Sequence, residues 1–174
     1  MQKTNSVVYG VIEGTWLSPV YLAMGSDGLV MIELGGSEKE FISSIKHLAE
    51  APARRDQEAT RTSTDQIRAY LKGERQAIDL PIDWSILSTF QRVVLQVTCN
   101  VPFGSVTTYG AIAQQIGKPD AARAVGQALS HNPIPLAIPC HRVLAIDGSL
   151  RGYGGSGDLE TKQALLELEG ASLS

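Results

Sequence analysis

The most constraining feature of the sequence is the hexapeptide Ile138-Pro139-Cys140-His141-Arg142-Val143, which overlaps the apolar run 134–138. Two prolines lie in this stretch, and proline lacks the N–H that a helix interior requires. The stretch is therefore predicted to be extended and buried, and to present Cys140 at a fixed point. A thiol becomes a strong nucleophile when it loses its proton, and a neighbouring imidazole is a common base. Consecutive extended side chains point to opposite faces, so contact between His141 and Cys140 requires a turn after Pro139 or a bridging water.

Further motifs surround the hexapeptide in a fixed order. They are Pro102-Phe103-Gly104, Thr108-Tyr109-Gly110, Ala121-Ala122-Arg123-Ala124-Val125-Gly126, Asn132-Pro133, Gly152-Tyr153 and Leu165-Leu166-Glu167-Leu168-Glu169-Gly170. Together they closely resemble the O6-alkylguanine-DNA alkyltransferases, also called methylated-DNA–protein-cysteine methyltransferases. The resemblance is strong in the C-terminal half and holds only in outline in the N-terminal half. A lone cysteine in an apolar context is more often a small buried hydrophobe. The resemblance reverses that expectation for Cys140.

Composition sets broad limits on the protein. A chain of 174 residues forms one or two small domains, and 43% hydrophobic with 19% charged residues is ordinary for a soluble protein. The cysteines Cys99 and Cys140 cannot make a disulfide framework, so a reducing cytoplasm (the nucleoid, in a prokaryote) is expected. No stretch approaches the roughly 18 apolar residues of a membrane span, and no secretion signal is expected. A formal net charge of −3 leaves room for a local basic face on DNA.

The first half is predicted to be an α/β domain over residues 1–84, similar in type to ribonuclease. Strands are expected at 7–12, 16–24 and 29–34, forming a three-stranded antiparallel sheet. A capping box from Ser37 to Glu40 opens a helix that ends near residue 49. A loop or irregular helix follows, then a helix that Ser63-Thr64-Asp65 caps and Gly73 ends, and a possible strand at 78–82. His47 has no ligand partners nearby, so no metal site is expected.

The second half, 85–174, is predicted to be mainly helical, which makes the fold class α/β overall. Helices are expected at 89–99, 109–116 and 120–130, the first with Phe90, Val93, Val94 and Val97 facing inward and Cys99 in the core. The last two helices, joined by Gly117-Lys118-Pro119, have the form of a helix-turn-helix.

Small residues line the second helix of this motif. Ala121, Ala122 and Gly126 could simply let two helices pack closely. They could equally allow close approach to a nucleic-acid backbone, since the long polar side chains that read bases are nearly absent. The resemblance implies the second interpretation, with this helix and its Gln127 in the minor groove of double-stranded DNA. It also implies that Arg123 enters the base stack where a damaged nucleotide leaves.

The resemblance implies a role for each residue of the site. Cys140 would accept the alkyl group, His141 would act as its base through a water, and Glu169 would orient that histidine. Tyr109 would contact the flipped base and the phosphate beside it, and Asn132 would tie the helix-turn-helix to the cysteine segment. The expected lining of the base pocket is Leu129, Val143, Tyr153 and Gly154. Arg142 is expected to make a structural ion pair or cap.

The implied reaction is transfer of the alkyl group from O6-alkylguanine, and potentially O4-alkylthymine, to Cys140. Tyr109 and the N–H groups of Cys140 and Gly154 would stabilise the departing guanine. The thioether product does not hydrolyse, so the protein would act once, as a monomer without a cofactor. Two alternatives remain: a protein that only binds alkylated bases, which a reactive cysteine disfavours, and a Cys-His-Glu acyl hydrolase that turns over. The Gly-rich loop 152–158 is longer than in typical members, with Gly154 where serine is usual, which predicts tolerance of bulky alkyl groups.

Overall fold

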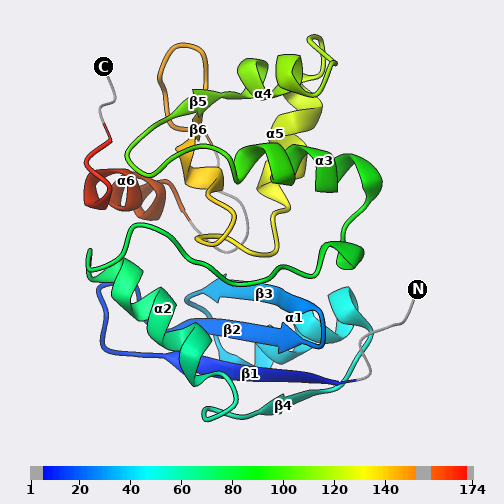
Figure 1. Cartoon of the computed structure of the whole chain (residues 1–174), viewed down its shortest axis with the longest axis vertical. Helices are drawn as coiled ribbons and strands as arrows, with labels where there is room; N and C mark the ends of the chain where they lie inside the picture. Colours follow the sequence, from blue (N-terminus) through cyan, green and yellow to red (C-terminus); the bar gives the residue numbers. More distant parts are fainter. Residues whose placement is uncertain (1–5, 152–157, 172–174) are drawn as a thin grey trace. The chain divides into compact units, whose positions relative to one another are not determined.

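Residues 6–151 and 158–171 are described by the structure, a computed structural model of the chain (Figure 1). The chain divides into two units, residues 1–86 and 87–174. The N-terminal unit contains β1 (Val7–Ile12), β2 (Val20–Gly25), β3 (Gly28–Leu34), α1 (Glu38–Ala49), β4 (Ala53–Arg55), α2 (Arg61–Leu71) and the short 3₁₀ helix η1 (Trp84–Ile86). The C-terminal unit contains α3 (Thr89–Thr98), β5 (Thr107–Thr108), α4 (Tyr109–Gln115), α5 (Ala122–Ser130), the 3₁₀ helix η2 (Cys140–Arg142), β6 (Val143–Leu144) and α6 (Leu159–Leu168).

The N-terminal sheet has the strand order β3-β2-β1-β4. Its first three strands are antiparallel neighbours, which confirms the predicted three-stranded meander. Ser26 and Asp27 close the hairpin between β2 and β3, and Gly28 lies against the backbone of Pro81, where a Cβ would collide. The fourth strand, β4, pairs in parallel with β1 and was not predicted. Its three residues are too few to show a period in the sequence.

The two faces of this sheet are covered by different helices (Figure 1). Alternate residues of β1 point to opposite faces. Tyr9 belongs to the core cluster on the α1 side, where Phe41 stacks on Tyr21 with ring centroids 5.2 Å apart. On the other side, Gly10 lies against Thr60 and Thr64, at the start of α2. Because both faces of the sheet are buried, the sequences of its strands are almost continuously apolar.

Several predicted boundaries in this unit are wrong. Strand β2 begins at Val20 rather than at residue 16, because residues 14–17 form bends. Helix α2 begins at Arg61, before the predicted cap, and its N-cap Thr60 makes no side-chain capping bond. The possible strand at 78–82 is reduced to a single bridge between Ile82 and Leu29. The predicted helix α1 is confirmed with its capping box from Ser37 to Glu40.

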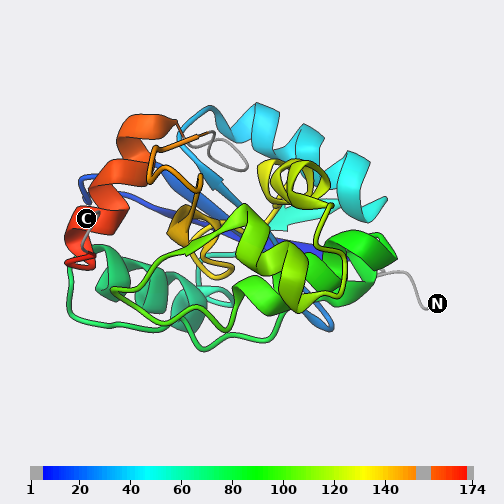
Figure 2. The ribbon, with the colours of Figure 1, turned by 90° about the horizontal axis from the view of Figure 1, so that it is seen from above.

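The C-terminal unit is built on three helices that pack on one another, α3, α4 and α5 (Figures 1 and 2). The predicted pair of short helices is confirmed as α4 and α5, and Gly117 takes the positive φ of +73° that the turn between them requires. Two predictions on α3 are wrong. Val93 is exposed rather than inward, and Cys99, expected in the core, is exposed at the end of the helix.

The rest of this unit places the hexapeptide. Strands β5 and β6 pair in parallel, which sets Thr108 beside Leu144 and so brings the start of α4 close to the end of the hexapeptide. Helix α6 packs on η2. Within residues 6–151 and 158–171, no helix is long and apolar enough to cross a membrane.

Candidate alkyl-transfer site

Residues 134–142 fold as a turn followed by a short 3₁₀ helix rather than as the predicted extended segment. The N–H of Ile138 donates to the carbonyl of Ile134 at 3.0 Å, and Leu136 has a positive φ of 72°. Cys140 then begins the 3₁₀ helix η2 and is only 4% exposed. Proline disfavours an α-helix but is compatible with such turns, so the predicted burial is correct and the predicted extension is wrong. A turn does follow Pro139, and this is one of the two arrangements that the sequence allowed for contact between His141 and Cys140.

Asn132 joins the end of α5 to the cysteine. Its side chain is fully buried, and its amide Nδ2 lies 3.2 Å from the Cys140 sulfur and 3.1 Å from the carbonyl oxygen of Ile138. Its Oδ1 accepts the N–H of Ile134 at 3.0 Å. The amide therefore ties both ends of the turn together and places an N–H donor on the sulfur. A hydrogen bond of this kind favours the thiolate over the thiol.

Glu169 is a buried acceptor for three residues. Its Oε1 lies 2.7 Å from Nε2 of His141 and 2.8 Å from Nη2 of Arg142, and its Oε2 accepts from Nε of Arg142 at 2.9 Å. The N–H of Gly104 donates to Oε2 at 3.2 Å. The contacts between Arg142 and Glu169 confirm the structural ion pair expected for Arg142. Arg142 also donates to the carbonyl of Val101 at 2.6 Å. Buried charges need this degree of pairing.

The contact with Glu169 selects one tautomer of His141. A carboxylate can only accept, so Nε2 carries the proton and Nδ1 carries the lone pair. Burial lowers the pKa of His141 below its usual value, and Arg142 and Lys162 lower it further, whereas Glu169 opposes this shift. His141 is therefore held neutral, the form in which it can accept a proton.

A buried lysine that was not predicted as a site residue donates to the backbone just after the 3₁₀ helix of Cys140. Lys162 of α6 is 1% exposed and donates to the carbonyl of Val143 at 2.7 Å and to that of Arg151 at 3.1 Å. The hydroxyl of Tyr109 donates to the same Arg151 carbonyl at 2.8 Å, and the Lys162 ammonium lies 5.9 Å from the Tyr109 ring centre. Burial, and then the charge of Cys140, raise the pKa of Tyr109, so its hydroxyl stays protonated as a donor.

Helix α5 presents a mostly small outer face. Arg123 and Gln127 are exposed, and Ala121, Ala122 and Gly126 are partly exposed; an added Cβ at Gly126 would lie 3.8 Å from the Tyr109 ring, an ordinary contact. Packing inside the unit therefore does not require glycine there. A groove of about 390 Å³ runs beside this face, lined by Ser88, Phe90, Gln91, Ala124, Gln127, Ala128 and His131.

Comparison with known proteins decides the family. The family model described as "6-O-methylguanine DNA methyltransferase, DNA binding domain" matches residues 89–171. The chain is 40% identical over 148 residues to the methylated-DNA–protein-cysteine methyltransferase of Mycobacterium tuberculosis, covering 85% of each chain. It is 37% identical over 163 residues to that of Methanosarcina barkeri, covering 92% of this chain and 96% of the relative. The chain belongs to the methylated-DNA–protein-cysteine methyltransferase family.

A solved structure extends this likeness to the fold. The crystal structure of Mycobacterium tuberculosis OGT in complex with DNA matches 94% of this chain and 92% of that one, with 34% identity and a TM-score of 0.76. The predicted fold class, an N-terminal antiparallel sheet with helices followed by a mainly helical unit, is thereby confirmed.

The remaining predicted residues of this methyltransferase fall into two groups. Leu129 and Val143 are buried, at 3% and 0% exposure. Tyr153 and Gly154, with the rest of the predicted Gly-rich wall, lie outside the described residues.

One backbone N–H that was predicted to stabilise the departing guanine has another partner. The N–H of Cys140 already donates to the carbonyl of Ile138 at 2.8 Å. It is therefore not available to O6 in this conformation.

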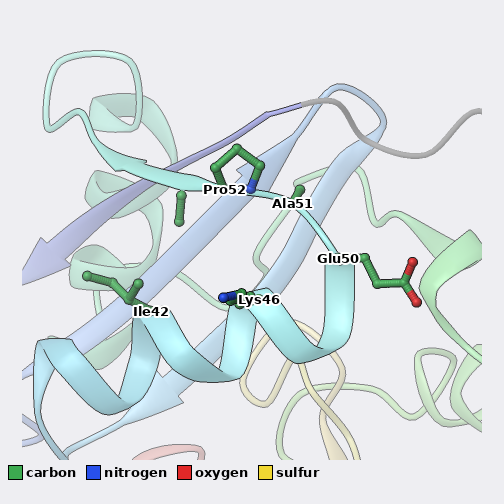
Figure 3. Close-up of a pocket in the computed structure, with 6 residues that line it drawn as sticks. Ile42, Lys46, Glu50, Ala51 and Pro52 are labelled. Carbon is green, nitrogen blue, oxygen red and sulfur yellow. The ribbon is translucent and has the colours of Figure 1, made fainter.

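The N-terminal unit also contains a hollow, and the side chains that line it differ in kind from those around Cys140. The hollow has a volume of about 610 Å³ and is lined by Ile42, Lys46, Glu50, Ala51, Pro52 and Ala53 (Figure 3). Figure 3 shows the Glu50 carboxylate directed away from the other lining side chains. The lining contains no thiol or imidazole. Across the described residues of both units, no group of three or more His, Cys, Asp or Glu could hold a metal ion.

Proposed function

We propose that Cys140 is the acceptor in the alkyl transfer by which this methyltransferase family repairs DNA, and that it reacts once with O6-alkylguanine in a duplex. The observation that carries the proposal is the buried Cys140 sulfur held 3.2 Å from the Asn132 amide, next in sequence to a histidine that contacts a carboxylate at 2.7 Å. Nucleophile, base and orienting acid are thus assembled within one unit. The other cysteine, Cys99, is exposed and lies at the end of α3, away from this set in sequence.

The chemistry follows from these positions. His141 takes the thiol proton, through a water, and the sulfur forms a bond to the alkyl carbon as the bond from that carbon to O6 breaks. The electron pair remains on guanine, which regains a proton, so the thiol proton is balanced by the proton on the released base. Glu169 stabilises the imidazolium that forms in between. The product thioether leaves no route back to the thiol, which limits each molecule to one event.

Tyr109 supplies a donor for the departing base. Its hydroxyl donates to the Arg151 carbonyl at 2.8 Å in the structure, so it must exchange that acceptor for guanine when the base enters. The raised pKa of Tyr109 keeps the hydroxyl protonated at neutral pH. A donor aimed at the developing anion lowers the barrier.

We infer that α5 enters the minor groove of DNA. Its outer face is small enough for close approach, and Gly126 has room for a methyl group inside the unit, which supports a role in DNA contact rather than in helix packing. Arg123 is exposed in the first turn of α5, where a planar guanidinium can fill the space left by a flipped base. We expect a monomer to suffice, because one unit contains the whole reactive set. Its substrate places the protein in the compartment that holds DNA.

Mass spectrometry tests the acceptor directly. The protein is incubated with duplex DNA containing one O6-methylguanine and then digested, and the peptides of Cys140 and Cys99 are compared. The expected result is the mass gain of one methyl group on the Cys140 peptide, at most one per molecule, and none in Cys140→Ala. A methyl group on Cys99, or repeated turnover with an unmodified Cys140, would overturn the proposal.

A further inference from the structure

The turn that follows β6 presents the most exposed large hydrophobic side chain among the described residues. Ile146 is 96% exposed, whereas the next such residue, Trp16, is 49% exposed. Single apolar residues are common on protein surfaces, so this exposure by itself assigns no role. The structure of the turn and its neighbours decide what Ile146 can contact.

The turn is held by its own hydrogen bonds. The N–H of Ala145 donates to the carbonyl of Ser149 at 3.2 Å, and the N–H of Gly148 donates to the carbonyl of Ala145 at 2.9 Å. Asp147 accepts from the N–H of Ser149 at 3.0 Å and from its hydroxyl at 2.6 Å. A β-branched side chain on a turn of this kind has little freedom to lose on binding. An apolar contact made by Ile146 therefore retains most of its free energy.

Both ends of the turn are fixed beside Tyr109. At its start, Leu144 pairs with Thr108, the residue before Tyr109. At its end, the Arg151 carbonyl accepts from the Tyr109 hydroxyl at 2.8 Å. The Tyr109 ring also lies 3.8 Å from the position of an added Cβ at Gly126, on the outer face of α5. Tyr109 thus links the turn, drawn in orange in Figure 1, to the face of α5 for which we infer contact with DNA.

A cation lies at the end of the same turn. The Arg151 side chain is 68% exposed, and its guanidinium is 3.7 Å from the Asp147 carboxylate, which is longer than a normal hydrogen bond. An exposed pair of this kind contributes little, so the guanidinium can exchange Asp147 for a phosphate. An apolar tip beside an arginine matches the minor groove of DNA, which has deoxyribose along its walls and phosphates along its rims.

We propose that residues 145–151 form a second DNA-binding element beside α5, in which Ile146 packs against the wall of the minor groove and Arg151 contacts a phosphate. This inference rests on the proposed placement of α5 in that groove. It assigns to the turn an apolar contact, which α5 with its small outer face does not supply.

The salt dependence of DNA binding separates the two contacts. Neutralising a phosphate releases counterions, so the affinity falls as salt rises, whereas an apolar contact has no such dependence. Fluorescence anisotropy measures binding of an unmodified duplex at a series of NaCl concentrations for the parent, Ile146→Ser, Ile146→Lys and Arg151→Gln. Ile42→Ser, at an exposed apolar position of α1, is the control, and chemical denaturation measures the stability of each variant.

Each variant has its own expected signature. Ile146→Ser should weaken binding about fivefold at every salt concentration, with the slope of log affinity against log salt unchanged. Arg151→Gln should weaken binding mainly at low salt and reduce that slope by about 1. Ile146→Lys should steepen the slope by about 1, because the added ammonium meets the phosphates. Ile42→Ser should bind as the parent does, and all four variants should unfold at the parental denaturant concentration.

Other outcomes overturn the inference. Parent-like affinity and slope in the three variants of the turn would remove it from the interface. A loss in Ile146→Ser that disappears at high salt, or that accompanies lower stability, would show that Ile146 makes no apolar contact with DNA. Arg123→Ala distinguishes this failure from that of the proposed function. If Arg123→Ala weakens binding and the turn variants do not, only the inference on the turn fails; if none of them weakens binding, the placement of α5 fails with it.

Discussion

Arg142 and Glu169 form a buried two-pronged ion pair, with Nε 2.9 Å from Oε2 and Nη2 2.8 Å from Oε1. Because His141 shares Oε1 at 2.7 Å, the arginine and the histidine compete for one carboxylate. This geometry holds the Glu169 carboxylate in a fixed position against His141. Burial lowers the pKa of His141 and Arg142 lowers it further, whereas Glu169 favours the charged form. His141 is therefore a base that is neutral at rest, with a carboxylate in place to stabilise the charge that it gains from the thiol.

Loss of the Glu169 charge should damage both fold and reaction. Glu169→Gln leaves the Arg142 guanidinium buried opposite a neutral amide, and breaking a buried pair costs about 3–5 kcal/mol. We expect chemical denaturation to show a loss of that order, and O6-benzylguanine transfer by the folded fraction to slow at least tenfold. Glu167→Gln, at an exposed position on the same helix, is the matched control. A stable, fully active Glu169→Gln protein would contradict the assigned network.

Asn132 provides a test of the donor on sulfur. Asn132→Asp preserves the shape of the side chain, but a carboxylate cannot donate to the Ile138 carbonyl or to the Cys140 sulfur, and its charge repels a thiolate. We expect Cys140 labelling by iodoacetamide at pH 7 to fall about tenfold or more, with a destabilisation of about 1–3 kcal/mol. Asn100→Asp, at an exposed position after α3, should behave as the parent protein. An unchanged labelling rate would mean that the amide does not act on the sulfur.

The lowered pKa of His141 predicts that the protein loses stability in acid. Its pKa is lowered by burial, so below about pH 6.5 the unfolded chain binds a proton that the folded chain does not. The contribution is present above the unfolded pKa and is lost as the pH falls from there toward the folded pKa, at up to about 1.4 kcal/mol per pH unit. Unfolding free energies at pH 7.5, 6.5 and 5.5 should fall less steeply in His141→Gln than in the parent. His47→Gln, at an exposed site, should keep the parental slope; equal slopes in all three would refute the prediction.

Local sequence signals predicted much of the fold. Ser37, Ser88 and Thr108 each cap a helix by accepting a backbone N–H, and α1, α3 and α4 begin directly after these residues. Where no such cap exists, the predictions missed: the predicted cap of α2 at Ser63 lies three residues after the observed N-cap Thr60, and the predicted start of α5 lies two residues before Ala122. The turn that holds Cys140 could not be read from the sequence, because it depends on the buried bond from Asn132 to Ile138.

The site was predicted from the resemblance more than from local pattern. Cys140, His141, Asn132 and Glu169 do lie together, although their chemical roles stay predictions. The signal for Lys162 was present but unused. Residues 162, 165, 166 and 169 follow the spacing of one helix face, and their burial puts a lysine and a glutamate on the apolar stripe of α6. A charged residue at a core position of a helix indicates a specific partner.

Arg123 should matter for duplex DNA and little for a free base. Its guanidinium is exposed in the first turn of α5, so Arg123→Ala should leave the unfolding free energy within about 0.5 kcal/mol. Because unstacking a base costs a few kcal/mol, repair of O6-methylguanine in duplex DNA should slow at least tenfold, while O6-benzylguanine transfer is retained. Arg123→Lys should recover little, since an ammonium has no flat face. Equal losses on both substrates would show that the arginine acts on the pocket instead.

Gly126 distinguishes close helix packing from close approach to DNA. A methyl group there meets the Tyr109 ring at 3.8 Å, and alanine is favoured over glycine in a helix by about 1 kcal/mol, so Gly126→Ala should fold at least as stably as the parent. The same methyl group adds bulk to the partly exposed face of α5 and should weaken binding to duplex DNA several-fold, with free O6-benzylguanine transfer unchanged. Gly110→Ala is the matched control, since it adds a methyl group to α4 that would lie 4.0 Å from the Thr108 hydroxyl. Fluorescence anisotropy with a labelled duplex measures the binding, and denaturation measures the fold. Destabilisation of Gly126→Ala would favour the packing interpretation, and unchanged DNA binding in a stable variant would remove α5 from the interface at this position.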